Sequence, residues 1–357
     1  MTRRRSLRIF ATLLLLIPVT AHTAVTTVKQ EKAPQPSTAS VTRQFTLESQ
    51  ISGGVPVSMT IVALSSEEGA AKAAMSQAVS RISSFSSELF SSGGVEEKIN
   101  ALKMGESLPL SDENFGFLSR VLDLCALTNG WFDIASSAQK SMILQRDWRR
   151  IRLNRETKSI SFKSNGVGVD LKRIAQGYAT DLALGEIQKA GFANALVRIG
   201  SAERNIGRDI FTPWSFQIGF GNRGDKLARR ALNYSLSNVA ATTVTSHDLG
   251  SGLMDPHSKQ LASGNGSQSI TVIAADASTS TAYALAAFVL GAKNGLKFVL
   301  SHPESKGIMV DSDGNLVASA GFGNASSTAA IESQRKSASD GGPNDLRQKE
   351  NEERSDQ

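Results

Sequence analysis

Cysteine is almost absent from this chain, which has one, Cys125, among its 357 residues. A single cysteine permits neither an internal disulfide nor a metal cluster held by cysteines. Cys125 lies in the apolar helical run from Phe117 to Leu127, which favours a small core side chain. The chain also lacks a nucleophile elbow, a P-loop and a His-Glu-x-x-His motif. Its lysines and arginines are interleaved with acids and form no aromatic-basic stripe, which argues against nucleic-acid binding.

Long apolar runs are scarce as well, and the one near the N-terminus, Ile9 to Val19, is too short to span a bilayer comfortably. Four arginines precede it, and Val19-Thr20-Ala21 follows as a cleavage site, so residues 1–21 predict a secretory signal peptide. No cysteine stands at the predicted cleavage site directly after the run, so the chain is not expected to be a lipoprotein. We expect an exported, soluble protein, periplasmic in a Gram-negative cell, with no integral membrane segment after cleavage.

Both ends of the remaining chain are poor in large apolar side chains. Residues 22–42 are rich in Thr, Ser, Pro and Lys and are interpreted as a linker. Residues 324–357 have too few hydrophobic side chains to offset the entropy of ordering, and predict a disordered tail. One domain is therefore expected between them, over residues 43–323.

Apolar spacing within this domain predicts helices over 67–89, 115–127, 281–290 and 295–300, the second behind a Ser111-Asp112 cap. Strands are predicted from about residue 45 and over 151–153, 159–162, 195–199, 215–220, 269–274 and 307–310. Residues 312–315 predict a hairpin turn.

The segment from Val169 to Gly200 has the pattern of a strand, a turn, a helix and a second strand. Asp170 follows a short apolar strand and precedes a helical face of apolar residues, so we expect it to cap the helix. Ala190-Gly191 predicts the end of that helix, and a buried strand follows. The exposed amides at such a helix start form a natural anion site.

This segment resembles the signature Asp-Leu-Gly-Gly-Ile-Ala-Lys-Gly-Tyr-Ala, followed by Asp, of the FAD:protein FMN transferases. The matching residues are Asp170, Leu171, Ile174, Ala175, Gly177, Tyr178, Ala179 and Asp181. Three further marks occur in the family's order: Gly130-Trp131-Phe132-Asp133, Pro213-Trp214 and Met254-Asp255-Pro256. The resemblance spans residues 43–323 and implies a single domain of the α/β class, mixed α+β, with mixed sheets and packed helices.

The resemblance implies an activity in which FAD is split at its pyrophosphate, with Mg²⁺ as the cation, and FMN is transferred to a threonine of an exported target protein. The positions it implies for FAD binding are Trp131, Phe132, Asp133, Asp170, Arg173 and Gln176. For Asp133 and Asp170, capping of a turn and of a helix is an equal alternative. Tyr178 and Asp181 are interpreted as helix-packing and surface positions.

Four elements of the family's site are altered. Thr281 stands at the position of a metal-binding Asp and Leu285 at that of a metal-binding Thr. Gly252 replaces a histidine, although His247 and His257 lie close by as candidates for its role. The third and fourth changes place Lys172, Arg173 and Gln176 at the signature's two glycines and lysine, and Ser201-Ala202 at a Gly-Asp pair.

Two functions stay open on this basis. The first is an exported transferase that attaches FMN to a threonine, with catalysis called into question by the replaced positions. The second is a non-catalytic descendant that binds FAD, another phosphate ligand or a partner protein. Arg173 likewise has two interpretations: a guanidinium that contacts a phosphate where the metal would lie, or a side chain in solvent on a site that has decayed.

Overall fold

The structure is a computed structural model that describes residues 41–137, 147–220, 230–246, 253–260, 262, 267–311 and 316–319. The predicted signal peptide, the predicted tail and the predicted turn at 312–315 lie outside the described residues. So does the predicted linker, except for residues 41 and 42, and Thr42 already begins the first strand.

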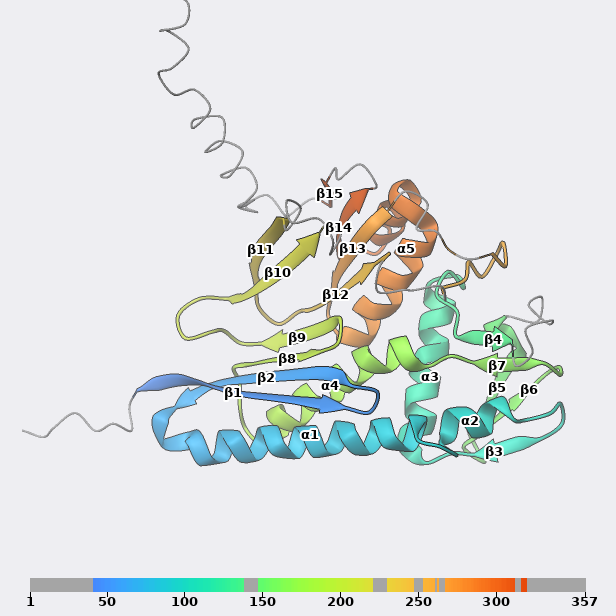
Figure 1. The fold of residues 1–357 in the computed structure, drawn as a ribbon, viewed down its shortest axis with the longest axis horizontal. Helices are drawn as coiled ribbons and strands as arrows, with labels where there is room; N and C mark the ends of the chain where they lie inside the picture. The colour runs from blue at the N-terminus through green and yellow to red at the C-terminus, as the bar shows by residue number, and fades with distance from the viewer. Residues whose placement is uncertain are drawn as a thin grey trace, which may run out of the picture. The chain divides into compact units, whose positions relative to one another are not determined.

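The main sheet has eight strands, all paired antiparallel, in the order β1-β2-β8-β9-β12-β13-β14-β15 (Figure 1). Their bounds are β1 Thr42–Ile51, β2 Val55–Leu64, β8 Ala195–Ile199, β9 Ala202–Ile206, β12 Ala240–Thr245, β13 Ser267–Ala274, β14 Lys306–Asp311 and β15 Leu316–Ala318. Strands β1, β8, β13 and β14 agree with the predictions, because each has the apolar pattern typical of a strand. The prediction missed β9 and β12, whose sequences are mostly small or polar.

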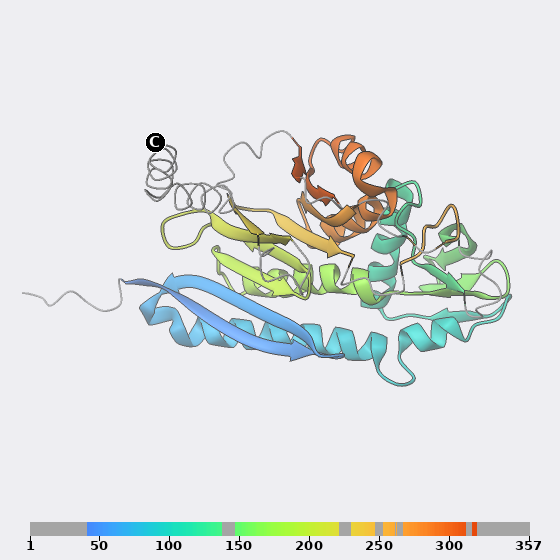
Figure 2. The ribbon, with the colours of Figure 1, turned by 45° about the horizontal axis from the view of Figure 1, so that its top comes forward.

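Three long helices pack along this sheet: α1 (Glu68–Phe90), α4 (Lys172–Lys189) and α5 (Ala277–Leu300). Helix α1 lies along the β1-β2 hairpin, α4 packs on β8 and β9, and α5 packs on β12, β13 and β14 (Figure 2). Helix α4 also contacts both α1 and α5. The apolar spacing that predicted α1 is the face it buries, with Ala71, Ala74, Ala78, Ile82 and Phe85 all buried.

The opposite face of β13 is covered by a hairpin of β10 (Trp214–Phe220) and β11 (Arg230–Leu236). Side chains alternate along β13, so Val272 joins the main core while Ile273 packs with Phe216 of β10. The prediction of a strand over 215–220 is confirmed.

The remaining elements lie between α1 and α4 in the sequence. They are α2 (Val95–Asn100), α3 (Asp112–Leu127), the three-stranded sheet of β3 (Ser107–Pro109), β6 (Ser159–Phe162) and β5 (Ile151–Asn154), and the pair β4 (Ala135–Ser137) and β7 (Val167–Val169). Short 3-10 turns, η2 (Ser65–Glu67) and η4 (Trp148–Arg150), precede α1 and β5. Ser111 caps α3 as predicted, because its side chain accepts a hydrogen bond from the Asn114 amide. Cys125 is buried in α3, as predicted.

Helix α5 unites the two helices predicted over 281–290 and 295–300. The break between them is a kink at Gly291, which has a φ of 77°. The helix is long and apolar enough to cross a membrane by length and composition alone. Its apolar side chains are instead buried against the sheet and α4, which accounts for its hydrophobicity.

Candidate functional site

A cavity of about 120 Å³ lies where four segments meet: the end of α3, the start of α4, the turn at 253–256 and one residue of α5. Its lining residues are Trp131, Phe132, Asp133, Ile134, Ala135, Asp170, Arg173, Ile174, Leu253, Met254, Asp255, Pro256 and Leu285. We call this cavity the cleft. The structure thus brings together five of the six positions at which the resemblance implies FAD binding.

The chain reaches the cleft from α3 through a tight reversal. Asn129 and Gly130 both have left-handed backbone conformations, with φ of 51° and 75°. The buried Thr128 hydroxyl lies under this turn and accepts a hydrogen bond from the Phe132 amide at 3.2 Å. The turn therefore fixes the direction in which Trp131 leaves the helix.

Asp133 closes the same turn through its carboxylate. One oxygen accepts a hydrogen bond from the Ala135 amide at 2.7 Å, and the other accepts one from the Trp148 amide at 3.1 Å. Burial raises the pKa of Asp133 to about 6, and these two hydrogen bonds oppose the rise. Asp133 is therefore both a turn cap and a carboxyl group that titrates near neutral pH.

Asp170 was predicted to cap α4, but the residue at the cap position is Leu171. The Asp170 carboxylate still accepts a hydrogen bond from the Lys172 amide, at 3.3 Å. The structure adds a support that local sequence patterns do not reveal, because the residues of α2 that hold this turn are 75 and 69 positions away in the sequence. Glu96 accepts a hydrogen bond from the Leu171 amide at 2.8 Å, and Asn100 pairs with both backbone groups of Val169.

The predicted Asp-Pro turn forms another wall of the cleft. The Asp255 carboxylate accepts hydrogen bonds from the His257 amide at 2.8 Å and the Ser258 amide at 3.2 Å. The His257 ring lies against the Trp131 ring, with centroids 4.0 Å apart and planes inclined by 34°. His257 is therefore at the rim of the cleft, while His247 and Gly252 lie outside the described residues.

A second cavity, of about 420 Å³, lies beside the first turn of α4 and is called the α1–α4 cavity here. Its lining residues are Ile51, Ser52, Gly53, Val55, Phe85, Ser86, Phe90, Lys172, Ala175, Gln176 and Ala179. Gln176, the sixth predicted position, faces this cavity, and its amide oxygen accepts a hydrogen bond from the Ser201 amide at 3.4 Å. Lys172 and Arg173 are consecutive in sequence but line different cavities.

The two positions at which the resemblance implies metal ligands do not supply a metal site. Leu285 lines the cleft but has no donor atom. Thr281 is buried at the crossing of α4 and α5, where its hydroxyl donates to the Ala277 carbonyl at 2.7 Å and lies 3.0 Å from that of Thr242. Within the described part of the chain, no three His, Cys, Asp or Glu side chains are grouped so that they could hold a metal. These residues do not fit the family's magnesium.

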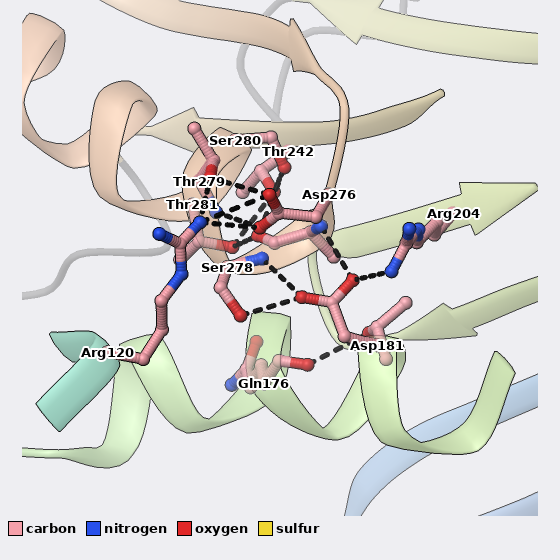
Figure 3. Close-up of polar contacts among 12 residues, drawn as sticks. Arg120, Gln176, Asp181, Arg204, Thr242, Asp276, Ser278, Thr279, Ser280 and Thr281 are labelled. Carbon is pink, nitrogen blue, oxygen red and sulfur yellow. Dashed lines mark hydrogen bonds and ion pairs between the residues drawn. The ribbon is translucent and has the colours of Figure 1, made fainter. Parts of the chain in front are cut away.

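Two carboxylates instead fix the start of α5 to its neighbours (Figure 3). Asp276 caps the helix and pairs with Arg120 of α3 at 3.1 Å. Asp181 of α4 accepts hydrogen bonds from the Ala277 and Ser278 amides at 2.8 and 2.9 Å.

Asp181 also pairs with Arg204 of β9 at 2.8 Å. Burial raises the pKa of Asp181, and the Arg204 guanidinium opposes the rise. The prediction that Asp181 lies at the surface is wrong, because its carboxylate is engaged by the start of α5 and by Arg204. The prediction failed because nothing in the local sequence shows that α5 begins beside this residue. Tyr178 does pack between helices as predicted, against Phe85 and Phe117.

The fold and the cleft together define a class: an α+β domain with a cleft of mixed polar and apolar lining at the start of one core helix. The profile of the ApbE family matches residues 54–309, and the chain belongs to this family. The resemblance and the mixed α+β fold class predicted from the sequence are thereby confirmed. No curated protein sequence matches the chain significantly.

Solved structures show the same fold at low sequence identity. The apo flavinyl transferase ApbE of Pseudomonas stutzeri is 19% identical, with a TM-score of 0.68 over 79% of this chain and 96% of that one. The flavin transferase ApbE of Vibrio cholerae is 16% identical, with a TM-score of 0.66 over 79% and 99%. The ApbE protein of Thermotoga maritima is 21% identical, with a TM-score of 0.65 over 79% and 98%.

Proposed function

We propose that this chain is an exported, FAD-binding member of the flavin transferase family that has lost the family's magnesium-dependent transfer of FMN. The observation that carries the proposal is the convergence of Trp131, Phe132, Asp133, Asp170 and Arg173 on one cleft. These residues come from two segments that the sequence separates by about 40 positions, and each lies at a position that the resemblance connects with FAD. Membership of the ApbE family supports the same ligand.

The chemistry of the two cavities suits a flavin dinucleotide. Trp131 supplies an aromatic surface in the cleft, and the half-buried Phe90 supplies one in the α1–α4 cavity. FAD has two planar ring systems joined by a pyrophosphate, so each ring can pack against an aromatic side chain. The predicted positions Arg173 and Gln176 line different cavities beside the start of α4, and one extended ligand that reached into both cavities would contact both residues.

The residues that replace the metal ligands account for the proposed loss of transfer. In transfer, a threonine oxygen would attack the phosphorus of the FMN half, the bond to AMP would break, and a base would take the hydroxyl proton. Leu285 and the hydrogen-bonded Thr281 offer no charged oxygen to a cation that screens these phosphates.

The second candidate function is FMN transfer to a threonine of an exported protein, and the preserved cleft favours it. Both candidates are tested by incubating the purified exported protein with FAD and Mg²⁺ or Mn²⁺ against an EDTA control. We expect saturable FAD binding, measured by the quenching of flavin fluorescence. We expect no release of AMP or FMN. Cation-dependent release of AMP would overturn the loss of transfer and establish the second candidate.

A matched pair of aromatic substitutions assigns the binding to the cleft. Trp131→Ala should weaken FAD binding by about ten-fold or more, because it removes the ring that lines the cleft. Phe211→Ala, at a side chain that is 88% exposed and lines neither cavity, should leave binding unchanged. Equal affinities for the two variants would contradict the placement of FAD in the cleft.

A further inference from the structure

We propose that His257 is a positioning residue for FAD binding, which acts by holding the ring of Trp131 in one orientation at the cleft. This inference rests on the proposed function, in which Trp131 packs against FAD, and it gives His257 a role in binding instead of proton transfer. The observation that carries it is the contact between the two rings. Their centroids lie 4.0 Å apart and their planes are inclined by 34°, so the rings are stacked and do not meet edge to face.

The main chain sets where Trp131 begins, but not how its ring is turned. The Trp131 amide donates a hydrogen bond to the Thr128 carbonyl at 3.0 Å, and the left-handed Asn129 and Gly130 set the direction of the chain. The side chain itself is half-buried and packs against the core on part of its surface. A half-buried indole can rotate about two side-chain torsions, so a second ring against its face restricts it to one orientation.

His257 is able to hold this ring because its own turn is fixed by hydrogen bonds. The Asp255 carboxylate accepts hydrogen bonds from the His257 and Ser258 amides at 2.8 and 3.2 Å. The Ala262 amide donates to the Leu253 carbonyl at 2.8 Å, which ties the two ends of the turn together. The His257 ring is therefore presented to Trp131 from a constrained main chain.

The ring pair also joins two walls of the cleft. Trp131 belongs to the segment that follows α3, and the turn that carries His257 contributes Asp255 and Pro256 to the lining of the same cleft. Loss of the His257 ring would uncover one face of Trp131 and remove the stacked contact between these walls. A ligand that packs on Trp131 would then have to order this side chain itself, at a cost in affinity.

Titration of FAD into the purified exported protein, measured by flavin fluorescence, tests this role. His257→Ala should raise the Kd by about three- to ten-fold, the range expected for the loss of one aromatic pair. His257→Phe keeps a planar ring without its nitrogen atoms and should restore the affinity. His302→Ala is the matched control and should leave the Kd unchanged, because His302 stacks on Tyr283 and Phe298 beyond the end of α5.

A double-mutant cycle separates positioning from direct contact with the ligand. If His257 acts through Trp131, His257→Ala should cause no further change in Kd in a protein that already carries Trp131→Ala. The ring contact can also be tested without a ligand. The emission of Trp131, obtained by subtracting the spectrum of the matching Trp131→Phe protein, should shift to longer wavelength in His257→Ala because the uncovered indole gains contact with water.

Three results would overturn this inference and leave FAD binding itself standing. They are additive losses in the cycle, a loss in His257→Phe as large as that in His257→Ala, and a Kd for His257→Ala equal to that of the His302→Ala control. Thermal unfolding of each variant checks that it is folded. Failure of the wild type to bind FAD would overturn the proposed function instead, and the emission shift would still test the ring contact.

Discussion

At the scale of single residues, Asp133 connects the stability of the fold to the cleft. Its carboxylate lines the cleft and holds the turn that positions Trp131. Burial raises its pKa from 3.8 to about 6, which means that the folded protein binds this proton more tightly than the unfolded chain does. The stabilisation from proton binding is fully present below about pH 3.8 and is lost as the pH rises through about 6.

This shift predicts a pH dependence that one substitution should remove. As the pH rises from 5 to 7, the loss of the proton from Asp133 should lower the wild-type free energy of unfolding by about 1 kcal/mol. Asp133→Asn cannot titrate, so its free energy of unfolding should fall by about 1 kcal/mol less over the same range. Urea unfolding at the two pH values measures both slopes. Asp123→Asn, at an exposed position of α3, should keep the wild-type slope, and a wild-type slope in Asp133→Asn would contradict the assignment.

At the scale of elements, the crossing of α4 and α5 sets the positions of the two helices that line the cleft. Gly177 lies at the closest approach, where an added Cβ would come within 2.5 Å of the Ala277 carbonyl oxygen and of the Thr281 hydroxyl. The absence of a side chain at this position lets the helices approach closely. Arg173 and Leu285 then reach the same cavity from different helices.

Two glycines of α4 provide a paired prediction. Gly177→Ala should lower the free energy of unfolding by about 1–3 kcal/mol, because the overpacked crossing outweighs the gain in helix propensity. Gly185→Ala, where an added Cβ would meet nothing within 4 Å, should raise it by about 0.5–1 kcal/mol. Chemical denaturation of both variants checks the difference in sign, and destabilisation of the same size in both would contradict the close crossing.

The success of the sequence predictions also differs by element. Helix α1, helix α3 and the β5-β6 hairpin were predicted closely, because each buries a continuous apolar pattern. The two predicted strands of the signature segment, β7 and β8, were found as well, since their residues are almost all buried. Strand β12 (AATTVT) was missed because its place in the sheet depends on pairing with β9 and β13, not on its own pattern.

The site shows the same division between local and distant information. Motif matches placed Trp131 and Asp170 at the cleft, because each lies beside a turn with its own sequence pattern. The supports of that turn, Glu96 and Asn100, were not predicted, since their partners are 75 and 69 residues away. Asp181 was misplaced for the same reason: its role is set by α5, which begins 96 residues later.

At the scale of the whole molecule, much of the net positive charge lies in the segment that the sequence predicts to be a signal peptide. Four arginines and no acids lie in residues 1–21, so removing this segment would reduce the net charge from +6 to +2. A basic N-terminal region before a short apolar run is the pattern of a cleaved signal peptide. Cleavage at the predicted site would therefore remove much of the positive charge behind the high isoelectric point of the full chain.

Expression of the full chain in a Gram-negative host should place the protein in the periplasm, with a mature N-terminus at His22. Since no cysteine follows the apolar run, the mass should match the unmodified polypeptide without a lipid. Cell fractionation followed by N-terminal sequencing and intact mass measurement checks each point. Deletion of residues 2–21 should keep the protein in the cytoplasm, which separates the effect of the segment from that of the domain. Full-length protein retained in the membrane fraction would contradict the predicted cleavage.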